Sequence, residues 1–277
     1  MKLCSIITML FTTGLFSQTQ VVMEDVMFID APYVGEVTTT TTKYATGGIF
    51  RQEVSIDVDR FLIRMAMGGN KKLGSLLNGN TESRIVYNVK DEEYAMETFD
   101  AILGNDGKPM LKSYNFSMNF SNGSKKEGDN KDLKLDDDSN DEGYSRMISE
   151  SLESISGFDA RKVTTEIKSE DGLMQIEEWF TADTTLFHFV AKVEADLVSS
   201  YGGQKRNNPR SFSERILKEA EHKFESVTGR MVRYTMEMKD KDNGFKMVWN
   251  LKSIREVPFN ITDFEILSDY KKVDELN

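Results

Sequence analysis

The clearest structural signal in the chain lies at residues 232–251, VRYTMEMKDKDNGFKMVWNL. Apolar and polar residues alternate on both sides of its centre, which is the pattern of two half-buried β-strands. The centre is polar and ends in Asn243-Gly244, a dipeptide typical of tight hairpin turns. One face of the predicted hairpin carries Val232, Tyr234, Met236, Met238, Phe245, Met247, Trp249 and Leu251. This stretch predicts an antiparallel hairpin with an apolar face of aromatic and methionine side chains.

The same two-residue period extends over much of the remaining chain. Residues 35–58 alternate, and the threonines at 38–42 favour a strand because they are β-branched. Further hairpins are predicted over residues 85–98 and 161–181, and another strand over residues 110–120. The pattern also extends to Phe61, Ile63, Met65 and Met67, which we expect to share one face of a strand. The chain therefore reads mainly as antiparallel sheet.

Two segments have a helical period instead. Ser211-Phe212-Ser213-Glu214 is a capping-box pattern, in which the first serine and the glutamate satisfy free N–H groups at a helix start. Apolar residues then recur at helical spacing, so we expect an amphipathic helix over residues 212–227, ending before Gly229. A second helix is predicted over residues 185–199. Strands with two helices place the protein in the α+β class.

The N-terminus has the layout of a secretory signal peptide. Lys2 is followed by the uncharged, largely apolar run Leu3–Phe16, and the polar residues Ser17–Gln20 come next. The run is shorter than the roughly 20 apolar residues that span a bilayer. The alternative is a buried N-terminal strand or helix. We expect residues 1–17 to be removed after Ser17, leaving a single domain at residues 18–277, exported and soluble, in the periplasm or outside the cell.

Composition excludes several classes of protein. The 277 residues have a formal net charge of −11, whereas nucleic-acid binding needs a basic surface. There is one cysteine, Cys4, within the predicted signal peptide, so neither a disulfide framework nor a thiolate zinc site is expected. Two histidines, His188 and His222, leave little room for histidine-based catalysis, and no nucleotide-binding or hydrolase motif is present. We expect neither catalysis nor a cofactor.

Residues 121–143, SNGSKKEGDNKDLKLDDDSNDEG, differ from the rest of the chain. They have too few apolar side chains to order themselves, so we expect a mobile acidic surface loop rather than a linker between domains. A calcium-binding EF-hand starting at Asp136 is not supported, because Asp141 stands where that loop needs glycine and Met147 where it needs glutamate. No metal site is predicted.

Patches in the second half of the chain carry a resemblance to a known family. They are the entry Ile155-Ser156-Gly157-Phe158 into a strand, a later strand ending near Trp179, and the closing stretch 264–271, FEILSDYK. The chain resembles an uncharacterised family of exported bacterial proteins similar to the LolA/LolB-like lipoprotein-carrier superfamily. The resemblance implies a strongly curved antiparallel sheet, a half-barrel, with helices covering its open side. It implies no catalytic residues.

Methionine is frequent, with 15 in the chain, and many share strand faces with aromatic residues. Such flexible, polarizable side chains can repack around varied apolar ligands, although they can also fill an irregular core. Together with the resemblance, this predicts a non-enzymatic protein that binds a lipid or another apolar molecule on the concave face. The expected ligand-binding residues are Met65, Met67, Tyr234, Met236, Met247 and Trp249. The alternative is an interaction or structural module of the cell envelope or secreted, acting through its acidic surface and loop 121–143.

The predicted signal peptide at residues 1–17 can be tested directly. Expressed with its own N-terminus in a bacterial host, the chain should be recovered outside the cytoplasm and should begin at Gln18. Intact-mass measurement and N-terminal sequencing of the exported fraction check both points. An uncleaved chain in the cytoplasm would contradict the prediction.

Overall fold

The computed structural model describes residues 19–32, 34–66, 69–112, 143–169, 172–204, 211–219, 222–239, 244–266 and 268–276. The predicted signal peptide at residues 1–17, and all of the predicted acidic loop except Gly143, lie outside these residues.

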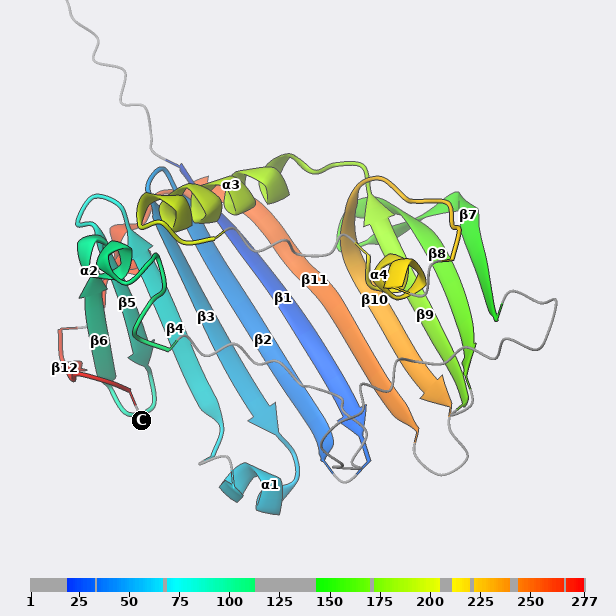
Figure 1. Ribbon diagram of the computed structural model, residues 1–277, viewed down its shortest axis with the longest axis horizontal. Helices are drawn as coiled ribbons and strands as arrows, with labels where there is room; N and C mark the ends of the chain where they lie inside the picture. Colours follow the sequence, from blue (N-terminus) through cyan, green and yellow to red (C-terminus); the bar gives the residue numbers. More distant parts are fainter. Residues whose placement is uncertain are drawn as a thin grey trace, which may run out of the picture.

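Twelve strands form one sheet, in the order β12-β6-β5-β4-β3-β2-β1-β11-β10-β9-β8-β7 (Figure 1). Neighbouring strands are antiparallel except for β12 and β6, which are parallel. The sheet is curved and stays open, with β7 and β12 at its two edges. The strands are β1 (Thr19–Ala31), β2 (Gly35–Thr46), β3 (Ile49–Val58), β4 (Lys71–Asn78), β5 (Ser83–Asn88), β6 (Glu93–Thr98), β7 (Tyr144–Ile155), β8 (Phe158–Ser169), β9 (Gly172–Thr181), β10 (Arg230–Lys239), β11 (Phe245–Pro258) and β12 (Lys271–Lys272).

The predicted C-terminal hairpin is confirmed as β10 and β11. Tyr234 pairs with Trp249, and Met236 pairs with Met247, so the side chains expected on one face do share it. The hairpins β5–β6 and β8–β9 are confirmed as well. The predicted α+β class and curved antiparallel sheet therefore describe the observed architecture.

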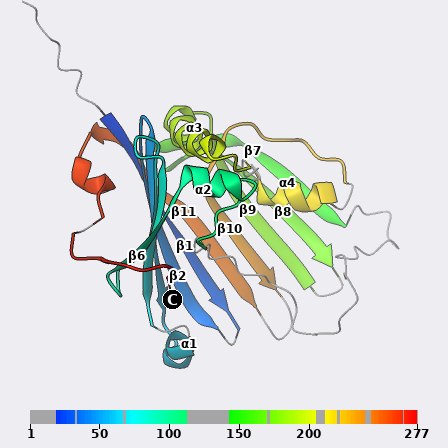
Figure 2. The ribbon, with the colours of Figure 1, turned by 60° about the vertical axis from the view of Figure 1, so that its left-hand side comes forward.

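Helices cover one face of this sheet, which we call the concave face. Figure 2 shows α2 (Phe99–Gly104), α3 (Thr185–Ser200) and α4 (Phe212–Glu219) together on that side. α3 matches its prediction closely and buries Phe187, Val190, Val193 and Leu197. Among the described helices, none is long and apolar enough to cross a membrane.

The predicted helix over residues 212–227 is too long. α4 ends at Glu219, and residues 222–228 are irregular. The backbone of this later part bonds to side chains of other elements, which replace the bonds that a helix would make: Tyr144 donates to the Lys223 carbonyl oxygen and Arg146 to that of Glu225. We call residues 222–228 the strap.

The strand predicted over Phe61–Met67 is wrong. Residues Phe61–Ala66 form the helix α1, and Met67 lies outside the described residues. β3 ends before Asp59, whose carboxylate accepts a hydrogen bond from the Glu36 N–H, and the next residues are free to turn. In the helix only Ile63 packs against the core, while Met65 is 63% exposed. Residues 110–112 of another predicted strand are also irregular, and 113–120 lie outside the described residues.

The two largest apolar clusters of the described residues lie between the helices and the sheet. The first, the α4 core, packs Leu217 of α4 against strands from both halves of the sheet: Ile29, Ala31, Val37, Val54, Ile56, Val58, Ile167, Ile176, Met236 and Met247. The second, the α3 core, packs α3 and α2 against β1 to β4: Val21, Ala45, Phe50, Leu77, Phe99, Ile102, Val190, Val193, Leu197 and Tyr201.

The C-terminal segment crosses the opposite, convex face (Figure 2). Its 3-10 helix η1 (Ile261–Phe264) is held by Gln20, whose amide nitrogen donates to Asp263 over 2.6 Å, and by Arg51, which donates to the Asp263 carbonyl oxygen. Beside it, Tyr87 lies flat over Gly74, and its hydroxyl accepts from Arg51 Nε (2.7 Å) and donates to Glu53 (3.0 Å). This polar cluster anchors the segment to β3 and β5.

Gly74 is required by the ring above it. A Cβ at this position would lie 2.0 Å from Tyr87 Cζ, and the bonds of the hydroxyl keep the ring in place. We expect Gly74→Ala to lower the free energy of unfolding by about 1–3 kcal/mol, as overpacking does. Urea titration measures the loss. The control is Gly104→Ala at the end of α2, where a Cβ meets nothing within 4 Å. Equal stability of the two variants would contradict this account.

Candidate functional site

Four of the six predicted ligand-binding residues come together on the concave face. Tyr234, Met236, Met247 and Trp249 adjoin each other in paired strands. Met65 lies in α1 at the rim, away from this group, and Met67 lies outside the described residues. The structure thus groups the four hairpin residues, and their role in binding a ligand stays a prediction.

This part of the face is filled. Met236 and Met247 are 5% and 8% exposed, because Leu217 of α4 packs in the same cluster. Above them, three rings stack in sequence: Phe212 of α4 on Tyr234 at 6.3 Å, and Tyr234 on Trp249 at 6.2 Å between centroids. The Tyr234 hydroxyl lies 2.7 Å from Met247 Sδ, and burial raises its pKa to about 12. These residues form a closed core rather than an open groove.

A carboxylate lies at the upper end of this stack. Asp25 of β1 is buried, and Trp249 Nε1 donates to its Oδ1 over 3.0 Å. Burial raises the pKa of Asp25, although the bond from Trp249 and the charge of Lys43 act in the opposite direction. The β-bulge between Glu24 and Asp25 lies at this point of the pairing with β11. Asp25 thus fixes the orientation of the Trp249 ring.

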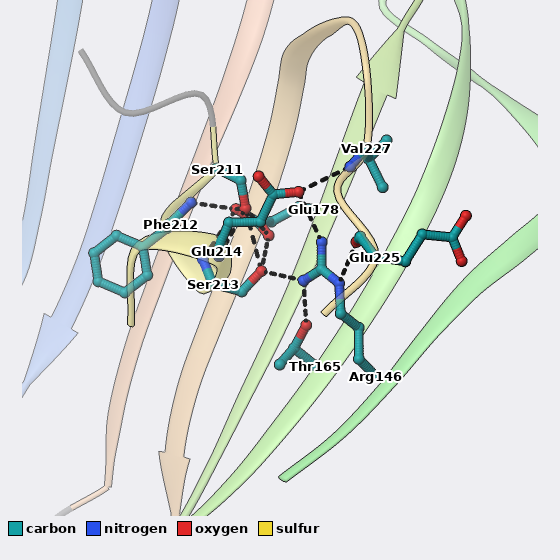
Figure 3. A network of polar contacts seen from close by, with 9 residues as sticks. All are labelled: Arg146, Thr165, Glu178, Ser211, Phe212, Ser213, Glu214, Glu225 and Val227. Carbon is teal, nitrogen blue, oxygen red and sulfur yellow. Dashed lines mark hydrogen bonds and ion pairs between the residues drawn. The ribbon is translucent and has the colours of Figure 1, made fainter. Parts of the chain in front are cut away.

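A buried carboxylate also holds α4 on the sheet (Figure 3). Glu178 of β9 is fully buried and accepts hydrogen bonds from the first residues of the helix. Ser211 Oγ donates to it at 2.9 Å, and the backbone N–H of Phe212 donates at 2.6 Å. Ser213 donates from its hydroxyl. A carboxylate is stabilised here because the start of a helix presents free N–H groups and a partial positive charge.

The predicted capping box is half formed. Ser211 Oγ accepts from the Glu214 N–H over 3.0 Å, as the pattern requires. The Glu214 side chain instead accepts from Arg146 at 3.1 Å and from the Val227 N–H at 2.9 Å. Arg146 of β7 also donates to Thr165 and Ser213 (Figure 3). One continuous network therefore joins β7, β8, β9, α4 and the strap.

A cavity of about 620 Å³ lies beside this network. The strap forms one side of it, and β7, β8 and β9 form the other. Six apolar side chains, of which Phe180 is almost fully buried, line it together with charged and small polar residues. The lining residues are Ile148, Leu152, Gly157, Phe158, Asp159, Arg161, Phe180, Thr181, Ala182, Asp183, Glu225, Ser226, Val227 and Thr228. We call it the strap cavity. Unlike the α4 core, it leaves space for a ligand.

A second, smaller cavity of about 480 Å³ lies beside α3 and α2. Phe99, Phe189, Val193 and Leu197 supply its apolar wall, and its acidic residues are Glu82, Asp100 and Asp196. Lys192 of the same wall pairs with Asp196 at 2.5 Å. This cavity lies far along the sheet from the strap cavity, and its three acidic residues can serve as a control for those of the strap cavity.

The polar network and the strap cavity were not among the predicted site residues. A usable signal was present, because Glu178 follows Met174 and Ile176 on the apolar parity of its strand. Arg146 likewise shares the parity of Tyr144 and Ile148. A charged residue in an apolar row points to a buried network, since burying a charge without partners is costly.

The described residues supply little catalytic chemistry. His188 is exposed on α3, and the His222 ring packs against Tyr144 at 4.7 Å between centroids. Within the described ranges, no group of three or more His, Cys, Asp or Glu side chains is placed to hold a metal ion. The arrangement suits binding of a molecule by burial of its apolar surface.

Glu178 should be essential for the seating of α4. Glu178→Gln replaces an acceptor oxygen by an amide group that faces other donors, so we expect a loss of about 2–3 kcal/mol in unfolding free energy. The matched control is Glu177→Gln. Glu177 is half-exposed, and its carboxylate lies 2.7 Å from the Lys162 ammonium group. Its substitution should lower the free energy of unfolding by less than about 1 kcal/mol. Urea titration of both variants measures the difference. Equal losses would argue against a special role for Glu178.

No protein-family model and no curated protein matches the sequence. Among solved structures, the chain is similar to a LolA superfamily protein from Nitrosomonas europaea, with 12% identity, 90% and 91% of the two chains covered and a TM-score of 0.26. A candidate outer membrane lipoprotein-sorting protein domain from Vibrio parahaemolyticus has 9% identity, 89% coverage of each chain and a TM-score of 0.24. A DUF1329 family protein from Desulfovibrio piger has 13% identity, 90% and 91% coverage and a TM-score of 0.24. The fold class follows from the strands and helices of this chain itself.

Proposed function

We propose that this protein binds an apolar or amphipathic small molecule on the concave face of its sheet, without catalysing a reaction. The observation that supports the proposal is the strap cavity, about 620 Å³ in volume with apolar side chains from three neighbouring strands. Pockets for small molecules commonly have volumes of roughly 300–1,000 Å³ and are mostly apolar with a few polar groups. The volume of the cavity falls in this range, and polar and apolar residues share its lining.

The location differs from the one expected from the sequence. The predicted Met236 and Met247 are covered by α4, so a ligand there would have to displace a helix held by Glu178. The strap cavity needs no such displacement. The binding energy would come from removing apolar surface from water, at about 25 cal/mol per Å² before the costs of association. The hairpin β10–β11, with its methionine and aromatic side chains, then has a structural role, because β10 pairs with β9 of the cavity wall.

The strap suits such a role because side chains, rather than a helix, hold it. Its backbone is bound at Lys223, Glu225 and Val227 by Tyr144, Arg146 and Glu214. None of these bonds belongs to a strand pair, so breaking them would leave the pairing of the sheet unchanged. A bulky ligand can therefore be admitted by a shift of the strap while the sheet stays intact.

Export is part of the proposal through the sequence of residues 1–17 and stays a prediction. The alternative function, an interaction module acting through its acidic surface and loop 121–143, also stays a prediction, because residues 121–142 lie outside those described. Protein partners are not assigned.

The test is binding of 1-N-phenylnaphthylamine, whose fluorescence rises when it enters an apolar site. The wild type should bind it, and Leu152→Glu should weaken binding about tenfold or more, because a carboxylate would enter the apolar lining. Leu152 is already 58% exposed, so the variant should fold. Circular dichroism checks this.

Met147→Glu is the matched control. Met147 lies on the same strand and is 67% exposed, but it does not line the cavity, so its variant should bind like the wild type. The proposal fails if the wild type does not bind the probe, or if the two variants lose binding equally.

A further inference from the structure

The mouth of the strap cavity has an uneven charge. Three carboxylates, Asp159, Asp183 and Glu225, line it against one guanidinium, that of Arg161. All four residues are exposed, so their charges face the entrance rather than the apolar interior. They come from three separate segments: β8, the turn after β9, and the strap.

Two cations of the neighbouring strands are paired with other acids. Arg146 pairs with Glu214 at 3.1 Å, and Lys162 pairs with Glu177 at 2.7 Å. Within the described ranges, no salt bridge includes Asp159, Asp183 or Glu225. Asp183 accepts only a long bond from the Thr185 N–H, at 3.4 Å. Arg161 is the one cation among the lining residues, so three carboxylates against one guanidinium leave the mouth with a net charge of −2.

Charge at the entrance of an apolar cavity selects the head of an amphiphile. An anionic head would be repelled by the three carboxylates and by a chain with a net charge of −11, whereas an ammonium head would be attracted. The attraction acts close to low-dielectric protein and is therefore stronger than between ions in open water.

We infer that the ligand of the strap cavity is an amphiphile with a cationic head, its apolar tail lying against Ile148, Leu152, Phe158 and Phe180 and its ammonium group at Asp159, Asp183 and Glu225. The inference rests on the proposed function, because the cavity supplies the ligand site and the carboxylates determine only the charge of the head.

Three ligands with the same C12 chain test it by isothermal titration below their micelle concentrations: dodecyltrimethylammonium, dodecanoate and dodecyl maltoside. The cationic ligand should bind the wild type at least about tenfold more tightly than dodecanoate, and the ratio should fall as salt rises. The triple variant Asp159→Asn/Asp183→Asn/Glu225→Gln should reduce this preference to within about threefold while dodecyl maltoside binds unchanged.

A matched variant separates the site from the overall charge. Glu82→Gln/Asp100→Asn/Asp196→Asn removes the same number of charges at the second cavity and should keep the preference. Loss of preference in this variant, or equal binding of all three ligands to the wild type, overturns the cationic head but leaves ligand binding standing. If none of the three ligands binds, the proposed function fails and the inference fails with it.

Discussion

The pairing of β1 with β11 holds the two halves of this molecule together. β2 to β6 continue the sheet on one side of the pair, and β10 to β7 continue it on the other. The register runs from Thr19 opposite Pro258 to Asp30 opposite Lys246, with one irregularity at Glu24 and Asp25. That irregularity places a buried carboxylate where it accepts from Trp249, so the ring stack on β10 and β11 depends on it. Without this pair, both the α4 core and the α3 core would lose the β1 residues that pack in them.

How far the sequence predicts this fold depends on how each strand is buried. β10 and β11 alternate cleanly and meet at Asn-Gly, so their pairing could be predicted residue by residue. β1 could not, because Val21 and Met23 on one face and Val22 and Val26 on the other are all apolar, and such a strand has no alternation. α1 was mistaken for a strand because six residues are too few to separate a period of 2 from one of 3.6.

The candidate site could likewise be predicted from the sequence only in part. The shared face of Tyr234, Met236, Met247 and Trp249 followed from parity alone. Whether that face is open depends on α4, whose position is determined by contacts between residues far apart in the chain. Glu178 and Ser211 are 33 residues apart, and Arg146 and Glu214 are 68 apart. No local pattern predicts such contacts, although a charge within an apolar row indicates where one is needed.

The pairing of the first and last long strands, β1 and β11, within the sheet also constrains the order of events during synthesis. Asp25 and Trp249 are 224 residues apart, so the central pair cannot form until nearly the whole chain is available. Contacts between such distant residues slow folding, because the long loop between them must be closed first. Export of this chain is a prediction from residues 1–17, and slow folding would suit it. A late central pair would leave the polypeptide unfolded for longer, and an exported chain has to be unfolded when it is threaded across a membrane.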